Sequence, residues 1–148
     1  MIFLVHHGEA AAADVDPQRP LTAGGRMHVD RLARAAAQRG VKPAAIWHSG
    51  KLRARQTAEA FLRACNPLAE YSAIRGLQPD DPAKWIADIL RDEPRDVMLV
   101  GHMPQLPRLL TRLVAGEDTP LLDFPPHGMI AVAPSGGTFE ERWRMTSA

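Results

Sequence analysis

Histidines follow three short apolar segments of this 148-residue chain. His6 and His7 come directly after "MIFLV", His48 closes "AAIWH", and His102 follows "VMLVG". Arg53 lies shortly after the second segment, in "HSGKLRARQT". Imidazole and guanidinium groups both donate hydrogen bonds to anions, and the planar guanidinium fork matches phosphate oxygens. The residue types therefore predict a phosphate-binding pocket, provided that the fold brings the three segments together.

The alternation of apolar and amphipathic segments predicts such a fold. Apolar runs predict strands at 1–6, 44–49, 69–74 and 96–102, with a closing hairpin of 127–134 and 139–146 around "SGG". Helical signals predict helices at 21–40, 51–65, 80–92 and 104–116. Strands that alternate with helices favour a mostly parallel sheet covered on both faces, a three-layer α/β/α sandwich. We expect one domain that spans 1–148.

Two of the predicted helices carry patterns that can be checked residue by residue. Thr22 suits the N-cap of the 21–40 helix, because its hydroxyl can accept a hydrogen bond from a free backbone amide. The apolar spacing predicts that this helix buries Val29, Leu32, Ala33 and Ala36. The same reasoning predicts that the 80–92 helix buries Trp85, Ile86, Ile89 and Leu90.

Composition excludes several classes of protein. The net charge of +1 is too balanced to favour binding to nucleic acid or to an anionic membrane. No apolar run approaches the roughly 18 residues that a membrane span needs, and the short N-terminal run does not resemble a signal peptide. The single cysteine, Cys65, excludes an intramolecular disulfide and suits a reducing cytoplasm. Nothing in the sequence requires more than a monomer.

The predicted architecture also indicates where a ligand would bind. In open α/β sheets the ligand lies beyond the carboxyl ends of the strands, which is where the four histidines named above are expected. One histidine at such a place is usually only a polar residue at the rim of the sheet. Its occurrence at three strand ends favours a functional pocket. His28 and His127 lie outside this pattern.

Four motifs in order resemble the histidine phosphatase superfamily: "VHHGEA", "RPLTAGG", "HSGKLRARQTAE" and "VGHMP". The short length and "RPLTAGG" resemble its SixA-type phosphohistidine phosphatases, and the superfamily has the phosphoglycerate mutase-like fold. The resemblance implies that His7 is the nucleophile, that Arg53 binds phosphate, and that His102 stabilises the phosphoryl group. His6 stands where the family has its first phosphate-binding arginine. The partner implied is a phosphorylated histidine-containing protein or a small phosphorylated compound.

The implied reaction proceeds in two steps without a metal or another cofactor. Neutral His7 attacks phosphorus, and water then hydrolyses the phosphohistidine enzyme. We expect a backbone carbonyl to hold the other nitrogen of His7, and Gly8 to let the chain turn close to the ring. We expect His102 to be protonated by the adjacent negative charge. The predicted phosphate ligands are His6, Gly8, Arg53 and His102, with Arg19 and His48 as further candidates.

Position 6 departs from the family motif, and several carboxylates are candidates for the general acid. Imidazole lacks the guanidinium fork, and a protonated His6 would donate better, so we expect a slow phosphatase with an optimum shifted to acidic pH. Arg19, Lys51, Arg55 or His48 are the side chains available to compensate. Asp80, Asp81 and Glu9 are the carboxylates available as general acid, although "PDDPAKW" also suits a turn before a helix.

Three alternatives stand beside this interpretation. The chain could be a phosphate or phosphoprotein binding module without turnover, which the missing arginine motivates. It could hydrolyse small phosphate esters instead of a phosphoprotein. A metal site of His6, His7, His48 and His102 is disfavoured, because adjacent strand residues point to opposite faces and no carboxylate has ligand-like spacing.

Overall fold

The computed structural model describes residues 1–116 and 119–146. Its elements follow the predicted order, and the bounds differ from the prediction only by short stretches at the ends. The strands are β1 (Ile2–His6), β2 (Ala45–His48), β3 (Glu70–Ala73), β4 (Val97–Gly101), β5 (Met129–Ser135) and β6 (Thr138–Met145). The helices are α1 (Ala23–Gln38), α2 (Leu52–Cys65), α3 (Ala83–Arg91) and α4 (Gln105–Val114). Within the described residues, no helix is both long enough and apolar enough to span a membrane.

All six strands form one sheet in the order β3-β2-β4-β1-β5-β6. The pairings β3–β2, β2–β4 and β4–β1 are parallel, whereas β5 runs antiparallel to both β1 and β6. The predicted mostly parallel sheet is therefore confirmed. The antiparallel direction of β5 places the start of that strand beside the carboxyl end of β1.

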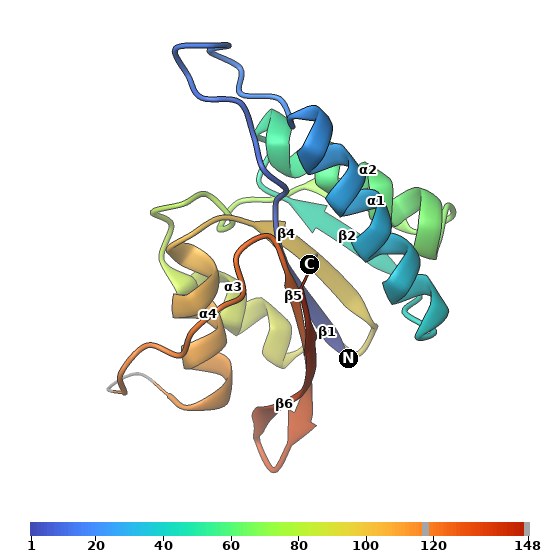
Figure 1. Ribbon diagram of the computed structural model, residues 1–148. Helices are drawn as coiled ribbons and strands as arrows, with labels where there is room; N and C mark the ends of the chain where they lie inside the picture. The colour runs from blue at the N-terminus through green and yellow to red at the C-terminus, as the bar shows by residue number, and fades with distance from the viewer. Residues whose placement is uncertain (117–118, 147–148) are drawn as a thin grey trace.

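The helices cover both faces of the sheet, as predicted (Figure 1). Helices α1 and α2 pack on one face through a core that includes Leu32, Ala58 and Phe61. Helices α3 and α4 pack on the other face, where Ile86 and Leu109 belong to a second core. Since both faces of the central strands are covered, β1 and β4 are buried along their whole length.

The local predictions for the helices are confirmed in part. The Thr22 hydroxyl accepts a hydrogen bond from Gly25 N–H at 2.9 Å, and the predicted apolar face of α1 is buried. The prediction for α3 is wrong for Trp85 and Ile89, which are 38% and 47% exposed. Only the strip of α3 that faces α4 and the sheet is covered, and the face of Trp85 stacks instead against the guanidinium of Arg75.

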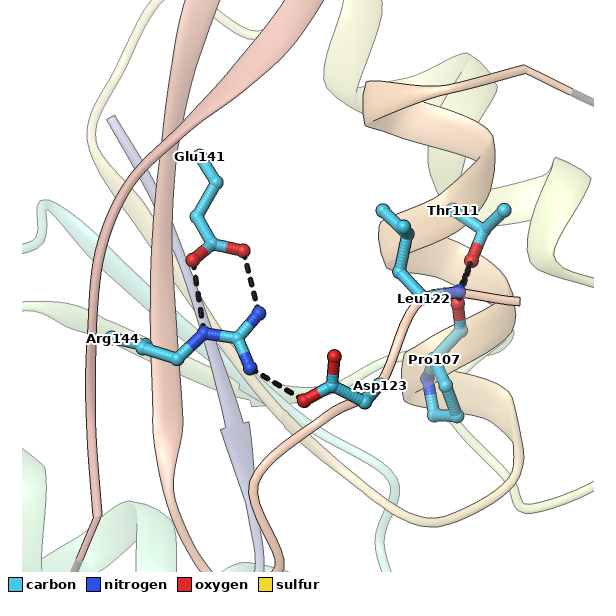
Figure 2. A network of polar contacts seen from close by, with 6 residues as sticks. All are labelled: Pro107, Thr111, Leu122, Asp123, Glu141 and Arg144. Atoms are coloured by element: carbon cyan, nitrogen blue, oxygen red, sulfur yellow. Dashed lines mark hydrogen bonds and ion pairs between the residues drawn. The ribbon is translucent and has the colours of Figure 1, made fainter. Parts of the chain in front are cut away.

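The segment 119–128 returns the chain from α4 to the start of β5, and polar contacts anchor it on both sides (Figure 2). Leu122 N–H donates to the Thr111 hydroxyl of α4 at 2.9 Å. On the other side, Arg144 of β6 donates to Asp123 at 2.8 Å and makes a two-bond ion pair with Glu141. These contacts orient the end of the segment, which carries His127 to the edge of the sheet.

Close packing explains the glycine that follows the two histidines. Gly8 does not adopt a positive φ, so a left-handed backbone conformation is not the reason for a glycine here. A Cβ on Gly8 would lie 2.5 Å from Val29 Cγ2 of α1, which is well inside van der Waals contact. The chain after β1 can therefore lie against α1 only because position 8 lacks a side chain.

We expect Gly8→Ala to lower the free energy of unfolding by roughly 1–3 kcal/mol, because the added methyl overpacks the contact with Val29. The double variant with Val29→Ala should lose less than the sum of the two single changes, as measured by urea denaturation. Gly24→Ala is the matched control, because a Cβ there meets nothing closer than 4.0 Å. Additive losses at positions 8 and 29 would contradict this explanation.

Candidate active site

Four histidines form one cluster at the edge of the sheet where β1 and β4 end. The ring of His7 lies 4.5 Å from His6 and 4.9 Å from His102, measured between ring centroids. The fourth ring, His127, stacks on His6 at 4.7 Å with an interplanar angle of 12°. The backbone brings these segments together, because His7 N–H bonds to Gly101 O and His6 N–H bonds to Gly128 O. The expected convergence of His6, His7 and His102 is therefore present.

The hydrogen bonds of His7 determine its tautomer. Nδ1 lies 2.7 Å from the carbonyl oxygen of Gly8. Because a carbonyl can only accept, Nδ1 carries the proton and Nε2 keeps its lone pair in the neutral ring. Burial is the main reason that the pKa of His7 falls to about 4, with the charge of Arg53 adding to the effect. The ring is thus neutral at pH 7, with one nitrogen available for attack.

A further hydrogen bond fixes the backbone of Gly8, whose carbonyl oxygen accepts from His7. Gly8 N–H donates to the Thr57 hydroxyl at 3.0 Å, and that hydroxyl donates to Arg53 O at 2.8 Å. Both backbone groups of Gly8 have partners within the protein, so neither is unpartnered in the way that Arg53 Nε and His102 Nδ1 are, and the contact of Gly8 with phosphate stays a prediction. Thr57 is a positioning residue that sequence reasoning did not single out, although it ends the motif "SGKLRARQT".

His6 is also neutral, and its tautomer is the opposite one. His127 N–H donates to His6 Nδ1 at 2.7 Å, so the proton of the neutral ring sits on Nε2. Burial, followed by the neighbouring charges of His7 and His127, lowers the pKa of His6 to about 3. A proton on Nδ1 would also break the bond from His127. These contacts favour a neutral His6 in the site without a ligand, and the acidic optimum of the reaction stays a prediction.

His127 belongs to the cluster although the sequence did not indicate it. Its Nδ1 lies 2.7 Å from His7 O and therefore donates to that carbonyl. The residue adopts a positive φ of 55°, which is uncommon for a residue with a side chain. The only signal in the sequence was its place at the start of the predicted strand 127–134. That signal points to the site only if this strand is known to be antiparallel to β1.

Two buried nitrogen atoms beside His7 have no hydrogen-bond partner: Arg53 Nε and His102 Nδ1. Arg53 lies in the first turn of α2, and its charge lowers the pKa of both His7 and His102 after the larger effect of burial. Buried polar groups are normally hydrogen-bonded, so two unpartnered nitrogens in one cluster indicate that the site receives a ligand with acceptor atoms.

Ser49 determines what His102 can offer that ligand. The Ser49 hydroxyl lies 2.6 Å from His102 Nε2 and accepts a bond from Lys51 N–H at 3.3 Å. When the hydroxyl donates its single proton to Nε2, the neutral ring carries its own proton on Nδ1, which can then act as a donor. Burial and the neighbouring His7 lower the pKa of His102 to about 3. In the site without a ligand the ring is therefore neutral, and it can donate without the protonation that we expected.

The remaining predicted phosphate ligands are Arg19, whose charge acts on the site, and His48, whose ring lies outside the cluster. Arg19 donates through Nε to Ala11 O at 3.0 Å, and its charge lowers the pKa of Arg53 and, as a minor cause, that of His7. The structure does not bring His48 into the cluster: its ring packs against Tyr71 at 4.9 Å and its Nδ1 accepts from Gly50 N–H. It is Ser49, one residue later, that contacts His102.

The other charged candidates are held by local contacts. Asp81 accepts hydrogen bonds from the amides of Gly76 and Gln78, as expected for a turn before α3. Glu9 accepts from the hydroxyl of Thr22. Arg55 is exposed and lies 3.8 Å from Glu59. Asp80 is exposed as well.

Three of the clustered histidines have the spacing of a metal site, but their hydrogen bonds do not suit one. One ring nitrogen each of His6, His7 and His127 can be chosen so that all lie within 4.8 Å of one another. A metal ligand must present a free lone pair, and neutral His6 has its Nδ1 lone pair engaged and a proton on Nε2. His7 and His127 alone retain a free lone pair, which is fewer ligands than a zinc site normally uses.

Comparison with known proteins identifies the class to which this site belongs. The sequence pattern of the histidine phosphatase superfamily, branch 1, matches residues 2–78, a little more than half of the chain. The chain therefore belongs to the histidine phosphatase superfamily, as its motifs predicted. No curated protein sequence matches the chain.

Solved structures place the chain beside SixA-type members of that superfamily. The protein histidine phosphatase SixA complexed with tungstate has a TM-score of 0.86 and 26% identity, covering 99% of this chain and 96% of SixA. A SixA protein from Agrobacterium tumefaciens has a TM-score of 0.78 and 26% identity, with 98% and 96% covered. A phosphoserine phosphatase from Entamoeba histolytica shares the fold at 14% identity, with a TM-score of 0.75 and 99% and 96% covered. Membership of the superfamily and the similarity to SixA structures together support phosphatase activity for this chain.

The buried neutral histidines predict how stability depends on pH. The pKa values of His6, His7 and His102 are lowered in the folded state, to about 3, 4 and 3, whereas an unfolded histidine titrates near 6.5. The unfolded chain therefore binds more protons below pH 6.5, and stability present above that pH is lost as the pH falls toward 4. Between pH 7 and 5, each ring should contribute a loss of about 2 kcal/mol.

Urea denaturation of wild type and His6→Asn at pH 7, 6 and 5 measures this contribution. The variant should lose about 2 kcal/mol less than wild type over that range, since it lacks one titrating ring. His28→Asn is the control, because His28 is exposed on α1. An identical pH dependence in wild type and His6→Asn would show that His6 is not a buried neutral histidine.

Proposed function

We propose that this chain is a phosphohistidine phosphatase that forms a covalent intermediate on His7. The observation that carries the proposal is the pair of unpartnered nitrogens, Arg53 Nε and His102 Nδ1, beside a ring whose Nε2 lone pair is free. A tetrahedral oxyanion would satisfy both nitrogens and bring its central atom toward the nucleophile. The tungstate held by the SixA relative is an oxyanion of that shape.

Each residue of the cluster has a distinct role in the first step of the reaction. His7 Nε2 attacks phosphorus in line while the Gly8 carbonyl holds the ring and stabilises the proton on Nδ1. Arg53 neutralises charge on the phosphoryl oxygens, and His102 donates through Nδ1. The bond between phosphorus and the leaving group then breaks. In the second step water attacks the phosphohistidine and releases phosphate, and His7 returns to its neutral form.

His6 supplies a neutral donor where the family has an arginine. Its Nε2–H offers one hydrogen bond, whereas a guanidinium offers a charged pair in a rigid fork. Loss of one preorganised donor to a transition state costs roughly 3 kcal/mol, or about a hundredfold in rate. Arg19, whose charge already reaches Arg53, is placed to compensate for part of this loss.

The substrate class that we propose is a phosphohistidine carried by a protein. The support is the similarity to SixA proteins over nearly the whole length of both chains, at 26% identity. Imidazole is also a better leaving group than an alkoxide, which suits a site with one arginine fewer than its family. A module that binds phosphate without turnover is the second candidate, and the observation that favours it is the neutral ring at position 6.

Variants of the two adjacent histidines test this function. We expect His7→Ala to lower turnover of a phosphohistidine-bearing protein by on the order of 10³-fold or more, because the nucleophile is lost. Wild type, mixed with labelled substrate and quenched in alkali, should retain the phosphoryl group on His7. A His7→Ala variant with full turnover would refute the assignment of the nucleophile, and phosphate binding without turnover in wild type would favour the binding module.

Restoring the family arginine tests the role of position 6. His6→Arg should raise kcat/KM for the same substrate by roughly tenfold to a hundredfold, because it adds a charged bidentate donor. His28→Arg adds the same charge on the exposed face of α1 and serves as the control. A rate that is unchanged or lower in His6→Arg would mean that His6 is not simply a weaker substitute for arginine.

Chelation tests the proposal that the reaction needs no metal. Turnover after prolonged treatment with EDTA, followed by gel filtration, should stay within about twofold of the untreated rate, since the side chains of the cluster supply every step. Loss of turnover that returns on addition of Zn²⁺ would contradict this and would make His6, His7 and His127 the first residues to substitute.

A further inference from the structure

We propose that His127 is the proton-transfer residue of this site, giving a proton from Nε2 to the leaving group and later taking one from the attacking water. The inference rests on the proposed phosphatase function and assigns a role that the family motifs leave open. It starts from the hydrogen bonds of the cluster, which determine what each of the four imidazoles can do.

His127 is held so that one nitrogen is structural and the other is free. Nδ1–H donates to His7 O at 2.7 Å, which ties the ring to the backbone of the nucleophile. The ring is further held by its stacking on His6. A proton can join or leave Nε2 while the Nδ1 bond stays intact, because an imidazolium is a donor at both nitrogens.

The other three rings are less suited to carrying a proton. His7 must keep its Nε2 lone pair to attack phosphorus. His6 accepts a backbone N–H at Nδ1, so protonation there would break a bond of 2.7 Å. His102 is 1% exposed and has Ser49 on one nitrogen, and its remaining Nδ1 is assigned to the phosphoryl group.

His127 is also more exposed to solvent than the other three histidines of the cluster. His6 and His7 are buried, at 7% and 8% exposure, whereas His127 is partly exposed. A residue that donates a proton in one step and recovers it in the next must exchange protons with water. Of the four rings, His127 is the one at the boundary between the cluster and solvent.

Two of the three carboxylates that the sequence offered for this role have partners elsewhere, and the third, Asp80, is exposed. Asp81 accepts two amide hydrogen bonds at the start of α3, and Glu9 accepts the hydroxyl of Thr22. By contrast, the contacts of Thr111 with Leu122 and of Arg144 with Asp123 anchor the segment that delivers His127 to the cluster (Figure 2). The fold thus places the ring of His127 beside that of the nucleophile, with 6.1 Å between the ring centroids.

The proton balance of the two steps is as follows. A bond forms between His7 Nε2 and phosphorus, the bond from phosphorus to the leaving atom breaks, and that atom takes its electron pair and the Nε2 proton of His127. Water then attacks phosphorus, the bond to His7 Nε2 breaks with its electron pair, and neutral His127 takes the proton of the water. Phosphate leaves, and the protonated His127 and neutral His7 are both restored.

The test uses His127→Asn and two aryl phosphates that differ in their need for an acid. Asn keeps an N–H in the position of Nδ1 to bond His7 O, but it has no group that can carry the proton. With phenyl phosphate, whose leaving group is a weak acid, kcat/KM should fall by about 10²- to 10⁴-fold. With 2,4-dinitrophenyl phosphate, whose leaving group needs no proton, the loss should be at least about tenfold smaller.

The second step gives an independent readout. In His127→Asn, 2,4-dinitrophenyl phosphate should release a burst of dinitrophenol equal to the enzyme concentration, because hydrolysis of the phosphoenzyme is slowed. His127→Gln, which also lacks a titrating group, should behave alike, and His28→Asn should match wild type. Thermal unfolding of each variant shows whether it is folded, and the retained reaction with the activated ester provides the same check.

The possible outcomes separate this inference from the proposed function. Equal losses with both esters would mean that His127 only positions His6 and His7, and would overturn the proton-transfer role while leaving the function intact. Wild-type rates in His127→Asn with both esters would overturn it as well. A wild-type chain that forms no phosphoenzyme with the esters or with phosphohistidine would overturn the proposed function, and the role of His127 with it.

Discussion

The hydrogen bond from His7 Nδ1 to the carbonyl oxygen of Gly8 is the contact on which the candidate site depends. It leaves the lone pair of the ring on Nε2, and a ring free to rotate or to exchange tautomers would offer that lone pair only part of the time. The bond requires the backbone at residue 8 to stay in place. Thr57 holds the amide of that residue from α2, and α1 packs so closely against it that only glycine fits. Both helices on one face of the sheet thus contribute to the orientation of a single imidazole.

Burial makes this arrangement effective and also makes it costly. Three of the clustered rings have lowered pKa values because water is excluded, so the nucleophile does not have to lose a proton before it attacks at neutral pH. The same exclusion leaves Arg53 Nε and His102 Nδ1 without partners. Unsatisfied buried groups destabilise a fold, and their presence is understandable where a ligand satisfies them during function. Burial of the site therefore lowers the stability of the fold at low pH. The same burial keeps the nucleophile neutral and leaves two donors already in place for a ligand.

The histidine at position 6 changes the site in a way that charge alone does not describe. An arginine would bring a permanent cation, whereas His6 brings a neutral donor whose tautomer is set by the backbone amide of His127. The two residues act as a pair, since the ring of His127 stacks on His6 and donates to the backbone of His7. The departure from the family motif at residue 6 is thus accompanied by a second imidazole from a distant part of the chain, and the two are best studied together.

The amino-acid sequence by itself determined the order and type of every described element, because apolar runs and helical periods are local properties. It also placed His6, His7, Arg53 and His102 together, because the ends of parallel strands meet at one edge of a sheet. Contacts between distant segments decided the rest. The exposure of Trp85 depends on how α3 sits against its neighbours, and the orientation of His48 toward Tyr71 depends on the pairing of β2 with β3. His127 reached the site only because β5 runs antiparallel to β1, and strand direction is a property of tertiary pairing that no local pattern encodes.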